Sequence, residues 1–281
     1  MTVRGILCDL DGVVYRGEVA CPGAIVALLA AQAAGVRVLF MTNNASRTPE
    51  EVAAQITGLG LPTDPSQVFT ASQVAARVLA DRRASGELVL GKTQVVLAVG
   101  GEGVGAALTD VGLPWRSPTQ LRTGVAAGSG ETVGVVVQGY GQDVGVRDLS
   151  EAAYALAAGA SWIATNDDAT LPTPRGLAVG NGSLVAAVAR ATDKAPEVVG
   201  KPYSPAYEQA IAALGLPIQD CLMIGDRLDT DIAGAAAIGL TSALVLTGVS
   251  TREEAQAQPE QTRPDHIAAT IGDLDFLWSQ P

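Results

Sequence analysis

The sequence predicts an α/β fold, a Rossmann-like parallel sheet with helices on both faces, with a second α/β domain inserted into it. Short and nearly continuous apolar runs, such as residues 3–8 and 36–41, alternate with segments of helix length. Apolar runs of this kind are typical of parallel strands that are buried on both faces. The alternation changes in character near residue 83 and resumes near residue 196, which indicates an insertion.

In the first part of the chain, capping signals indicate where helices begin. Thr48 with Glu51, and Thr70 with Gln73, have the spacing of a capping box, in which each side chain bonds the other residue's backbone N–H. The elements expected here, in order, are a strand over 3–8, a helix over 22–34, a strand over 36–41, and helices over 48–58 and 70–82.

The predicted domains are a core formed by residues 1–83 and 196–281 and an inserted domain over 84–195. In the insertion we expect strands over 94–99, 133–138 and 161–165, helices over 104–111, 149–158 and 183–192, and a polar, proline-containing loop over 166–181. In the second part of the core we expect strands over 198–199, 221–224 and 242–246, a helix over 204–214, and a short closing helix near residue 274.

Composition excludes several classes of protein. Of the 281 residues, 48% are apolar and 17% are charged, which excludes a disordered chain. The net charge of −11 and the lack of a Lys/Arg cluster argue against nucleic-acid binding. No apolar run approaches the roughly 18 residues of a membrane span. Acidic residues at positions 9 and 11 argue against a secretory signal.

Cysteine and histidine are informative because they are scarce. Cys8, Cys21 and Cys221 are odd in number and far apart, so we expect no disulfide framework and a reducing compartment, the cytoplasm. His266 is the only histidine, which excludes a site built from several histidines. If the chain is an enzyme, its acid, base and nucleophile are therefore expected to be carboxylates.

Polar residues follow several of the predicted strands directly. Asp9 and Asp11 end the first strand, the run 42–44 (Thr-Asn-Asn) ends the second, and Asp226 follows the strand over 221–224. Lys201 follows a shorter strand. In an open parallel sheet, ligands bind at the carboxyl ends of the strands, so we expect these residues to converge at one edge.

The chemistry of this set points to phosphate and a hard cation. Several carboxylates close together repel each other, and with only oxygen ligands available Mg²⁺ is the natural partner. A lysine and Thr/Asn donors beside that metal suit a phosphate group. Asp9 and Asp11 are close enough for separate roles, in which one attacks phosphorus and the other protonates the leaving oxygen.

Four motifs, taken in order, resemble those of the haloacid dehalogenase (HAD) superfamily, and the Thr-Asn-Asn form together with the place of the insertion resembles its NagD-like subfamily. That subfamily includes p-nitrophenyl phosphatases and phosphoglycolate, glycerol-phosphate and pyridoxal-phosphate phosphatases. The resemblance covers nearly the whole chain and implies that the inserted domain is a C2-type cap. The four motifs are residues 9–14 (DLDGVV), 42–48 (TNNASRT), 200–202 (GKP) and 225–232 (GDRLDTDI).

The resemblance implies roles for individual residues. Asp9 would be the nucleophile that forms an aspartyl phosphate, and Asp11 the general acid and base. Lys201 would steady Asp9 and the phosphate. The phosphoryl oxygens would be bound by Thr42, Asn43 and Asn44. Magnesium would be held by Asp9, the carbonyl of Asp11 and Asp226, with Asp231 close by. Arg175, in the cap loop that would face the active site, could meet a substrate carboxylate or remain solvated.

We therefore expect a Mg²⁺-dependent phosphatase that acts on small phosphorylated metabolites. Within the same class, a nucleoside-monophosphate or sugar-phosphate phosphatase is the alternative. An inactive binding or regulatory protein on the same fold is a second class. A dinucleotide-dependent oxidoreductase is a third, based on the glycine run at Gly101 and Gly103, which no acidic residue follows at the usual distance. The oligomeric state stays open, with a homodimer as one alternative.

Overall fold

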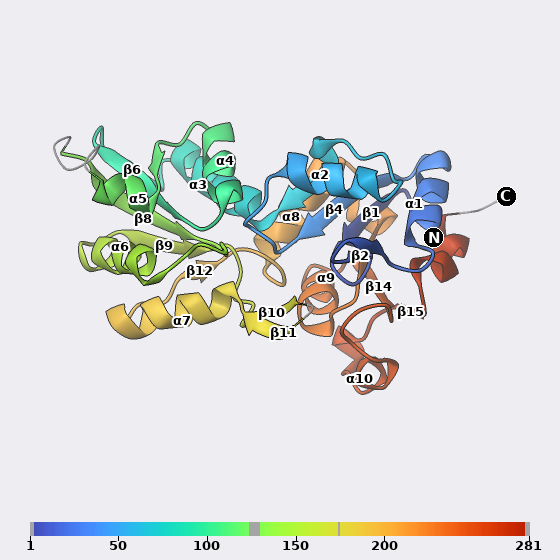
Figure 1. Cartoon of the computed structure of the whole chain (residues 1–281). Coiled ribbons are helices and arrows are strands. Elements are labelled where there is room, and N and C mark those ends of the chain that lie inside the picture. Colours follow the sequence, from blue (N-terminus) through green and yellow to red (C-terminus); the bar gives the residue numbers. More distant parts are fainter. Residues whose placement is uncertain (1–2, 124–129, 174, 279–281) are drawn as a thin grey trace. The chain divides into compact units, whose positions relative to one another are not determined.

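The structure, a computed structural model, describes residues 3–123, 130–173 and 175–278, and the chain divides into two compact units (Figure 1). Unit 1 consists of Met1–Thr42, Pro49–Phe69 and Lys201–Pro281, and unit 2 of Asn43–Thr48 and Thr70–Gly200. Each unit is built on a sheet of parallel strands flanked by helices, so the predicted α/β fold class is confirmed. None of the described helices is long and apolar enough to cross a membrane.

The sheet of unit 1 has the strand order β15-β14-β13-β1-β4-β5. β1 lies between β13 and β4 and is parallel to both, and β14 and β15 continue the parallel pairing beyond β13. The strands are β1 (Gly5–Asp9), β4 (Arg37–Thr42), β5 (Val68–Thr70), β13 (Cys221–Gly225), β14 (Thr241–Val245) and β15 (His266–Ala268), with a small antiparallel pair β2 (Tyr15–Arg16) and β3 (Val19–Ala20).

Helices cover both faces of this sheet, because successive side chains of a strand point to opposite faces. Ile6 and Cys8 belong to a hydrophobic cluster that includes residues of the first two helices. Gly5, on the other face, lies against Leu214 of α8. The helices are α1 (Ala24–Ala33), α2 (Pro49–Gly58), α8 (Ser204–Leu214), α9 (Ala233–Ala237) and α10 (Arg252–Gln256), with short 3₁₀ turns over 65–67, 218–220, 260–262 and 271–277 and a π turn η3 (Leu228–Ile232).

The sheet of unit 2 has the strand order β12-β9-β8-β6-β7, and its strand pairs are parallel. Its strands are β6 (Gln94–Val99), β7 (Trp115–Arg116), β8 (Thr132–Gln138), β9 (Ser161–Ala164) and β12 (Glu197–Val198). Its helices are α3 (Ala71–Ser85), α4 (Glu102–Asp110), α5 (Pro118–Arg122), α6 (Val146–Ala157) and α7 (Asn181–Thr192).

The loop predicted over 166–181 is wrong in part, because it contains the hairpin of β10 (Thr170–Thr173) and β11 (Gly176–Val179). Gly176 stands at the start of β11 with a φ of 118°, which few other residues adopt. The closing helix near residue 274 is a 3₁₀ helix over 271–277. The short strands β2, β3, β5, β7 and β15 were not predicted, since two or three residues carry too little periodicity.

The two compact units divide the chain at other residues than the predicted boundaries at 84 and 195. The capping box of Thr70 and Gln73 is confirmed, but the helix that it starts, α3, contacts α4 and is grouped with unit 2. Unit 2 also includes the six residues Asn43–Thr48, which directly follow β4. The pattern of apolar residues did not predict this grouping, because it indicates which residues are buried and not which unit buries them.

Candidate active site

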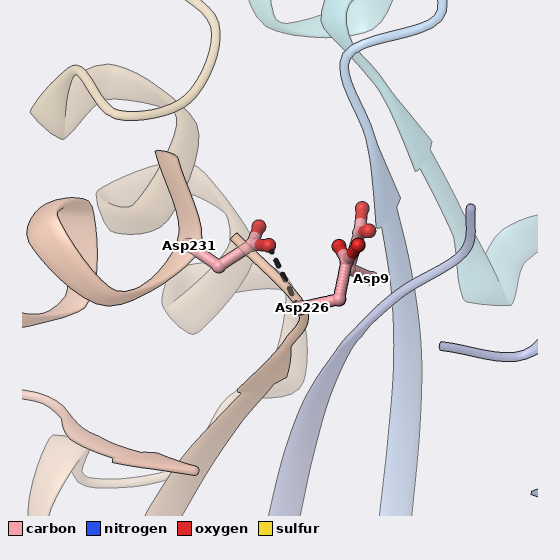
Figure 2. A group of neighbouring side chains, drawn as sticks. All are labelled: Asp9, Asp226 and Asp231. Atoms are coloured by element: carbon pink, nitrogen blue, oxygen red, sulfur yellow. Dashed lines mark hydrogen bonds between the residues drawn. The ribbon is translucent and has the colours of Figure 1, made fainter. Parts of the chain in front are cut away.

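Three buried carboxylates meet at the carboxyl end of the sheet in unit 1 (Figure 2). Asp9 is the last residue of β1, and Asp226 directly follows β13, the parallel neighbour of β1. Asp231 comes from the π turn η3 that follows. One carboxylate oxygen of each lies within 4.8 Å of the others. The strand-end rule therefore predicted this convergence correctly for Asp9 and Asp226.

Both oxygens of Asp231 are bound within the site. Its Oδ2 accepts hydrogen bonds from the backbone N–H groups of Asp226, at 3.2 Å, and Arg227, at 3.1 Å. Its Oδ1 accepts one from Lys201 at 2.6 Å. A Cβ at Gly225 would clash with the Asp231 side chain, so the close approach requires glycine. The turn that carries Asp231 is supported by the Tyr207 hydroxyl, which donates to the carbonyl of Thr230 at 2.7 Å.

Lys201 lies between two of the carboxylates and is only 4% exposed. Its Nζ donates to Asp9 Oδ1 at 2.5 Å and to Asp231 Oδ1 at 2.6 Å. Burial disfavours the charged ammonium, but the charges of Asp231 and Asp9 outweigh it and raise the pKa of Lys201 well above its ordinary value. Lys201 is therefore a permanent positive charge beside Asp9.

The carboxylates are not fully compensated by this one cation. Burial raises the pKa of Asp9 well above its ordinary value, and the charges of Asp231 and Asp226 act in the same direction against Lys201. Burial and the charge of Asp231 raise the pKa of Asp226 to about 7, against the effect of the Val249 N–H. Three carboxylates facing one lysine leave negative charge that a divalent cation would neutralise.

A metal ion fits an observation in this site. Asp226 Oδ2 accepts a hydrogen bond from the N–H of Val249 at 2.7 Å, whereas Asp226 Oδ1 is buried without a hydrogen-bond partner in the described part of the chain. A buried carboxylate oxygen without a partner is costly, and a cation removes the cost. All the donor atoms are oxygens, which Mg²⁺ prefers.

Two other predicted residues lie beside this group. Thr42 is the last residue of β4 and is 6% exposed, and the preceding Met41 is the β4 residue opposite Asp9. Asp11 is exposed and forms a backbone bridge with Tyr15. Among the described residues, the convergent carboxylates do not include that of Asp11, and its predicted role as acid and base stays a prediction.

The remaining predicted residues are described within unit 2. Asn43 Nδ2 donates to Asp168 Oδ2 at 3.1 Å. Asn44 Oδ1 accepts bonds from the backbone N–H and the hydroxyl of Ser46, at 2.9 and 2.7 Å. Arg175 is exposed in the turn that joins β10 and β11. The roles proposed for these three side chains in substrate binding stay predictions.

Sequence reasoning missed the loop that follows β14. Val249 donates its N–H to Asp226, and a Cβ at Gly248 would clash with the carboxylate of Asp226. A Cβ at Gly12 would clash with the same carboxylate. Thr247 Oγ1 donates to the carbonyl of Gly12 at 2.7 Å, which ties the two loops together. The signal was present, because this loop also follows an apolar parallel strand at its carboxyl end.

Known proteins match the chain along nearly its whole length. Residues 6–114 match the family described as haloacid dehalogenase-like hydrolase, and residues 198–274 the one described as HAD-hydrolase-like. The D-glycerol 3-phosphate phosphatase of Mycobacterium tuberculosis is 41% identical over 269 residues, which cover 96% of this chain and 70% of that protein. The 5'-nucleotidase YutF of Bacillus subtilis is 34% identical and covers 96% of both chains.

Solved structures of similar proteins indicate the same family. A crystal structure of the M. tuberculosis glycerol phosphate phosphatase in complex with magnesium has a TM-score of 0.83 at 40% identity, over 97% of this chain and 76% of that one. NagD from Escherichia coli K-12 has a TM-score of 0.80 at 26% identity, over 97% and 98% of the two chains. The chain belongs to the haloacid dehalogenase-like hydrolases and, within them, to the NagD-like group.

Proposed function

We propose that this protein hydrolyses small phosphomonoesters by forming an aspartyl phosphate on Asp9, with Asp11 as general acid and base. The chain is a phosphoric monoester hydrolase of its family, and Mg²⁺ is its metal cofactor. One observation carries the assignment of Asp9. Its buried carboxylate ends a strand, pairs with Lys201 at 2.5 Å, and lies beside the carboxylate of Asp226, whose Oδ1 has no hydrogen-bond partner among the residues that the structure describes.

In the first step, a carboxylate oxygen of Asp9 forms a bond to phosphorus and the bond from phosphorus to the ester oxygen breaks. Asp11 gives its proton to that leaving oxygen. Lys201 opposes the effect of burial on the pKa of Asp9 and places positive charge where the phosphoryl oxygens gather. In the second step, Asp11 takes a proton from water, which attacks phosphorus, releases phosphate and regenerates Asp9.

The metal would be held by the carboxylates of Asp9 and Asp226, together with the carbonyl of Asp11. Bound Mg²⁺ supplies charge neutralisation at the phosphoryl group. Asp231 plays a different part in this proposal, because both its oxygens already accept hydrogen bonds from Lys201 and two backbone N–H groups. It orients Lys201 and the backbone that carries Asp226, and would lie close to the metal.

Phosphate binding would come from the residues after β4. Thr42 lies next along the strand from the residue opposite Asp9, which supports a role for its hydroxyl in binding a phosphoryl oxygen. The side chain of Asn43 donates to Asp168 and the side-chain oxygen of Asn44 accepts from Ser46, and we assign the binding of the phosphoryl group by these two residues to their backbone N–H groups.

The substrate that we propose is of the glycerol-phosphate or phosphoglycolate type, which the 41% identity to the glycerol 3-phosphate phosphatase supports. A nucleoside monophosphate is the second candidate, supported by the similarity to the 5'-nucleotidase. Initial rates on glycerol 3-phosphate, phosphoglycolate, sugar phosphates and nucleoside monophosphates, each with Mg²⁺ and with a chelator, test the choice. A preference for nucleotides, or turnover that a chelator leaves intact, would contradict it.

We propose the cytoplasm as the compartment of this protein. The three cysteines are free and buried, which supports the reducing cytoplasm. A homodimer is the alternative to a monomer, and light scattering of the purified protein distinguishes them.

A further inference from the structure

The segment Asn43–Thr48, which follows β4 directly, is bound to unit 2 by a set of hydrogen bonds. The buried side chain of Asn166 donates to the carbonyl of Asn43 at 2.8 Å. The side chain of Asn43 donates to Asp168 Oδ2 at 3.1 Å, and the Asp168 N–H donates back to Asn166 Oδ1 at 3.2 Å. The turn after β9 is therefore hydrogen-bonded to both the backbone and the side chain of Asn43.

The far end of the segment is held by other elements of the same unit. Ser72, in the first turn of α3, donates its hydroxyl to the carbonyl of Ala45 at 2.8 Å. The N–H of Gly103, in the first turn of α4, donates to the carbonyl of Ser46 at 3.2 Å. The segment has no regular structure of its own, so these external bonds define its shape.

The glycine run after β6 has a packing role here. A Cβ at Gly101 would lie 2.5 Å from the carbonyl oxygen of Ser46, and one at Gly103 would lie 2.7 Å from that of Ala45. Neither glycine has a positive φ, so it is the close approach of the segment that requires them. Packing against this segment therefore accounts for both glycines, and they need no bound dinucleotide to explain them.

Gly200, the last residue before the chain returns to unit 1, also packs against the segment Asn43–Thr48. A Cβ at Gly200 would lie 2.9 Å from Asn43 Oδ1. Gly200 directly precedes Lys201, and Asn43 directly follows Thr42. Asn43 therefore packs between the turn at 166–168 and the residue that leads into the catalytic lysine.

We propose that Asp168 is a positioning residue for phosphate binding. By accepting the hydrogen bond of Asn43, together with Asn166 and the glycine pair at 101 and 103, it holds the turn after β4 in the shape in which its N–H groups bind the phosphoryl group. This inference rests on the proposed function, since it takes the turn as the anion site.

The test compares Asp168→Ala with the wild type. The loss of one hydrogen bond predicts that the KM for p-nitrophenyl phosphate and the inhibition constant of inorganic phosphate both rise about three- to tenfold. The Mg²⁺ concentration for half-maximal activity should not change, because the proposed metal ligands lie in unit 1. Asp168→Asn keeps an acceptor oxygen and should restore phosphate binding to near the wild-type value.

Matched controls separate positioning from general damage. Asp143→Ala removes the same charge from an exposed site in unit 2 and should leave every constant unchanged. Gly103→Ala should weaken phosphate binding more than Asp168→Ala does, because the added Cβ would push the segment away. Gly145→Ala is its control, since the nearest atom to a Cβ there is 4.0 Å away.

A double-mutant cycle with Asn43→Ala decides whether Asp168 acts through Asn43. If it does, the double variant should bind phosphate as weakly as either single variant and no weaker. Additive losses, or unchanged phosphate inhibition in Asp168→Ala while Asn43→Ala weakens it, would overturn the positioning role and leave the proposed function intact. If neither variant changes phosphate inhibition, the turn is not the anion site. Both the positioning role of Asp168 and the proposed phosphate binding by this turn are then wrong.

Discussion

Both units collect buried polar side chains at the carboxyl ends of parallel strands, but with different chemistry. In unit 1 the side chains are charged, and three carboxylates lie around Lys201, with Asp226 Oδ1 buried and without a hydrogen-bond partner in the described parts of the chain. In unit 2 they are mainly neutral amides. Asn166 and Asn181 donate to backbone carbonyls, while Asn181 Oδ1 and both side-chain amide atoms of Gln138 are buried without a partner among the described residues. Uncompensated charge indicates a site for a cation and for chemistry. Amides bonded to the backbone fix the path of the chain instead.

The largest expected effect is at Asp9. Asp9→Asn removes the nucleophile, so turnover should fall by about four orders of magnitude or more, with no phosphate added to the protein.

Asp11→Asn should behave differently with p-nitrophenyl phosphate, because p-nitrophenol needs little protonation to leave. It should release about one equivalent rapidly and then stall, since the base for the second step is missing.

Rapid-quench kinetics with intact-mass analysis measures both outcomes. A burst and a mass gain of one phosphate in Asp11→Asn, with neither in Asp9→Asn, is the expected result. Equal failure of the two variants without any burst would mean that both aspartates serve only the metal.

The next largest effect concerns metal removal and pH. In the folded, metal-free protein the pKa of Asp226 is raised from 3.8 to about 7, which corresponds to roughly 4 kcal/mol. Between these values the folded state holds more protons than the unfolded state, so stability falls as pH rises. Lys201 has a raised pKa, and its contribution is complete below its ordinary value of 10.5, so it stays constant in this window.

We therefore expect the melting temperature in a chelator to fall by roughly 5 to 10 °C between pH 5 and pH 8, and Mg²⁺ to abolish the fall. Thermal unfolding followed by circular dichroism measures it. Asp226→Asn is the control, because an amide does not titrate, and its fall should be smaller. A metal-free protein whose stability rises over this interval would contradict the electrostatic account of the site.

A smaller effect is expected at Gly248, where an added Cβ would clash with the carboxylate of Asp226. Gly248→Ala should raise the Mg²⁺ concentration for half-maximal activity about tenfold, as the displaced ligand costs on the order of 1–3 kcal/mol. Gly58→Ala is the matched control, since no atom lies within 4 Å of a Cβ there. Magnesium titration of initial rates compares the two, and equal behaviour would show that Asp226 does not depend on this close approach.

The smallest effect is expected at Arg175 in unit 2, which is exposed. If its guanidinium meets a substrate carboxylate, Arg175→Ala should raise the KM for phosphoglycolate about two- to fivefold, since an exposed ion pair contributes up to about 1 kcal/mol. The KM for p-nitrophenyl phosphate, which has no carboxylate, should stay the same. An equal change for both substrates would assign Arg175 to the solvated surface of the hairpin.

The sequence by itself determined the fold class and the residues at the strand ends. Buried parallel strands leave an unmistakable apolar run, and the first polar residue after each run lies at the carboxyl edge of the sheet. For this reason Asp9, Thr42 and Asp226 could be placed before the structure was known. The same rule applied to the strand at 241–245 would have found Val249, whose backbone N–H binds Asp226.

Only the tertiary structure decided how these groups are used. Lys201 pairs with Asp9 across 192 positions of sequence. Both carboxylate oxygens of Asp231 accept hydrogen bonds, one from Lys201 and the other from the backbone. Nor did any local pattern show that Asn43–Thr48 is held by unit 2, or that the glycines at 101 and 103 make room for it. The periodicity of a sequence reports which residues are buried, whereas the partner of a buried group is chosen by packing between segments far apart in the chain.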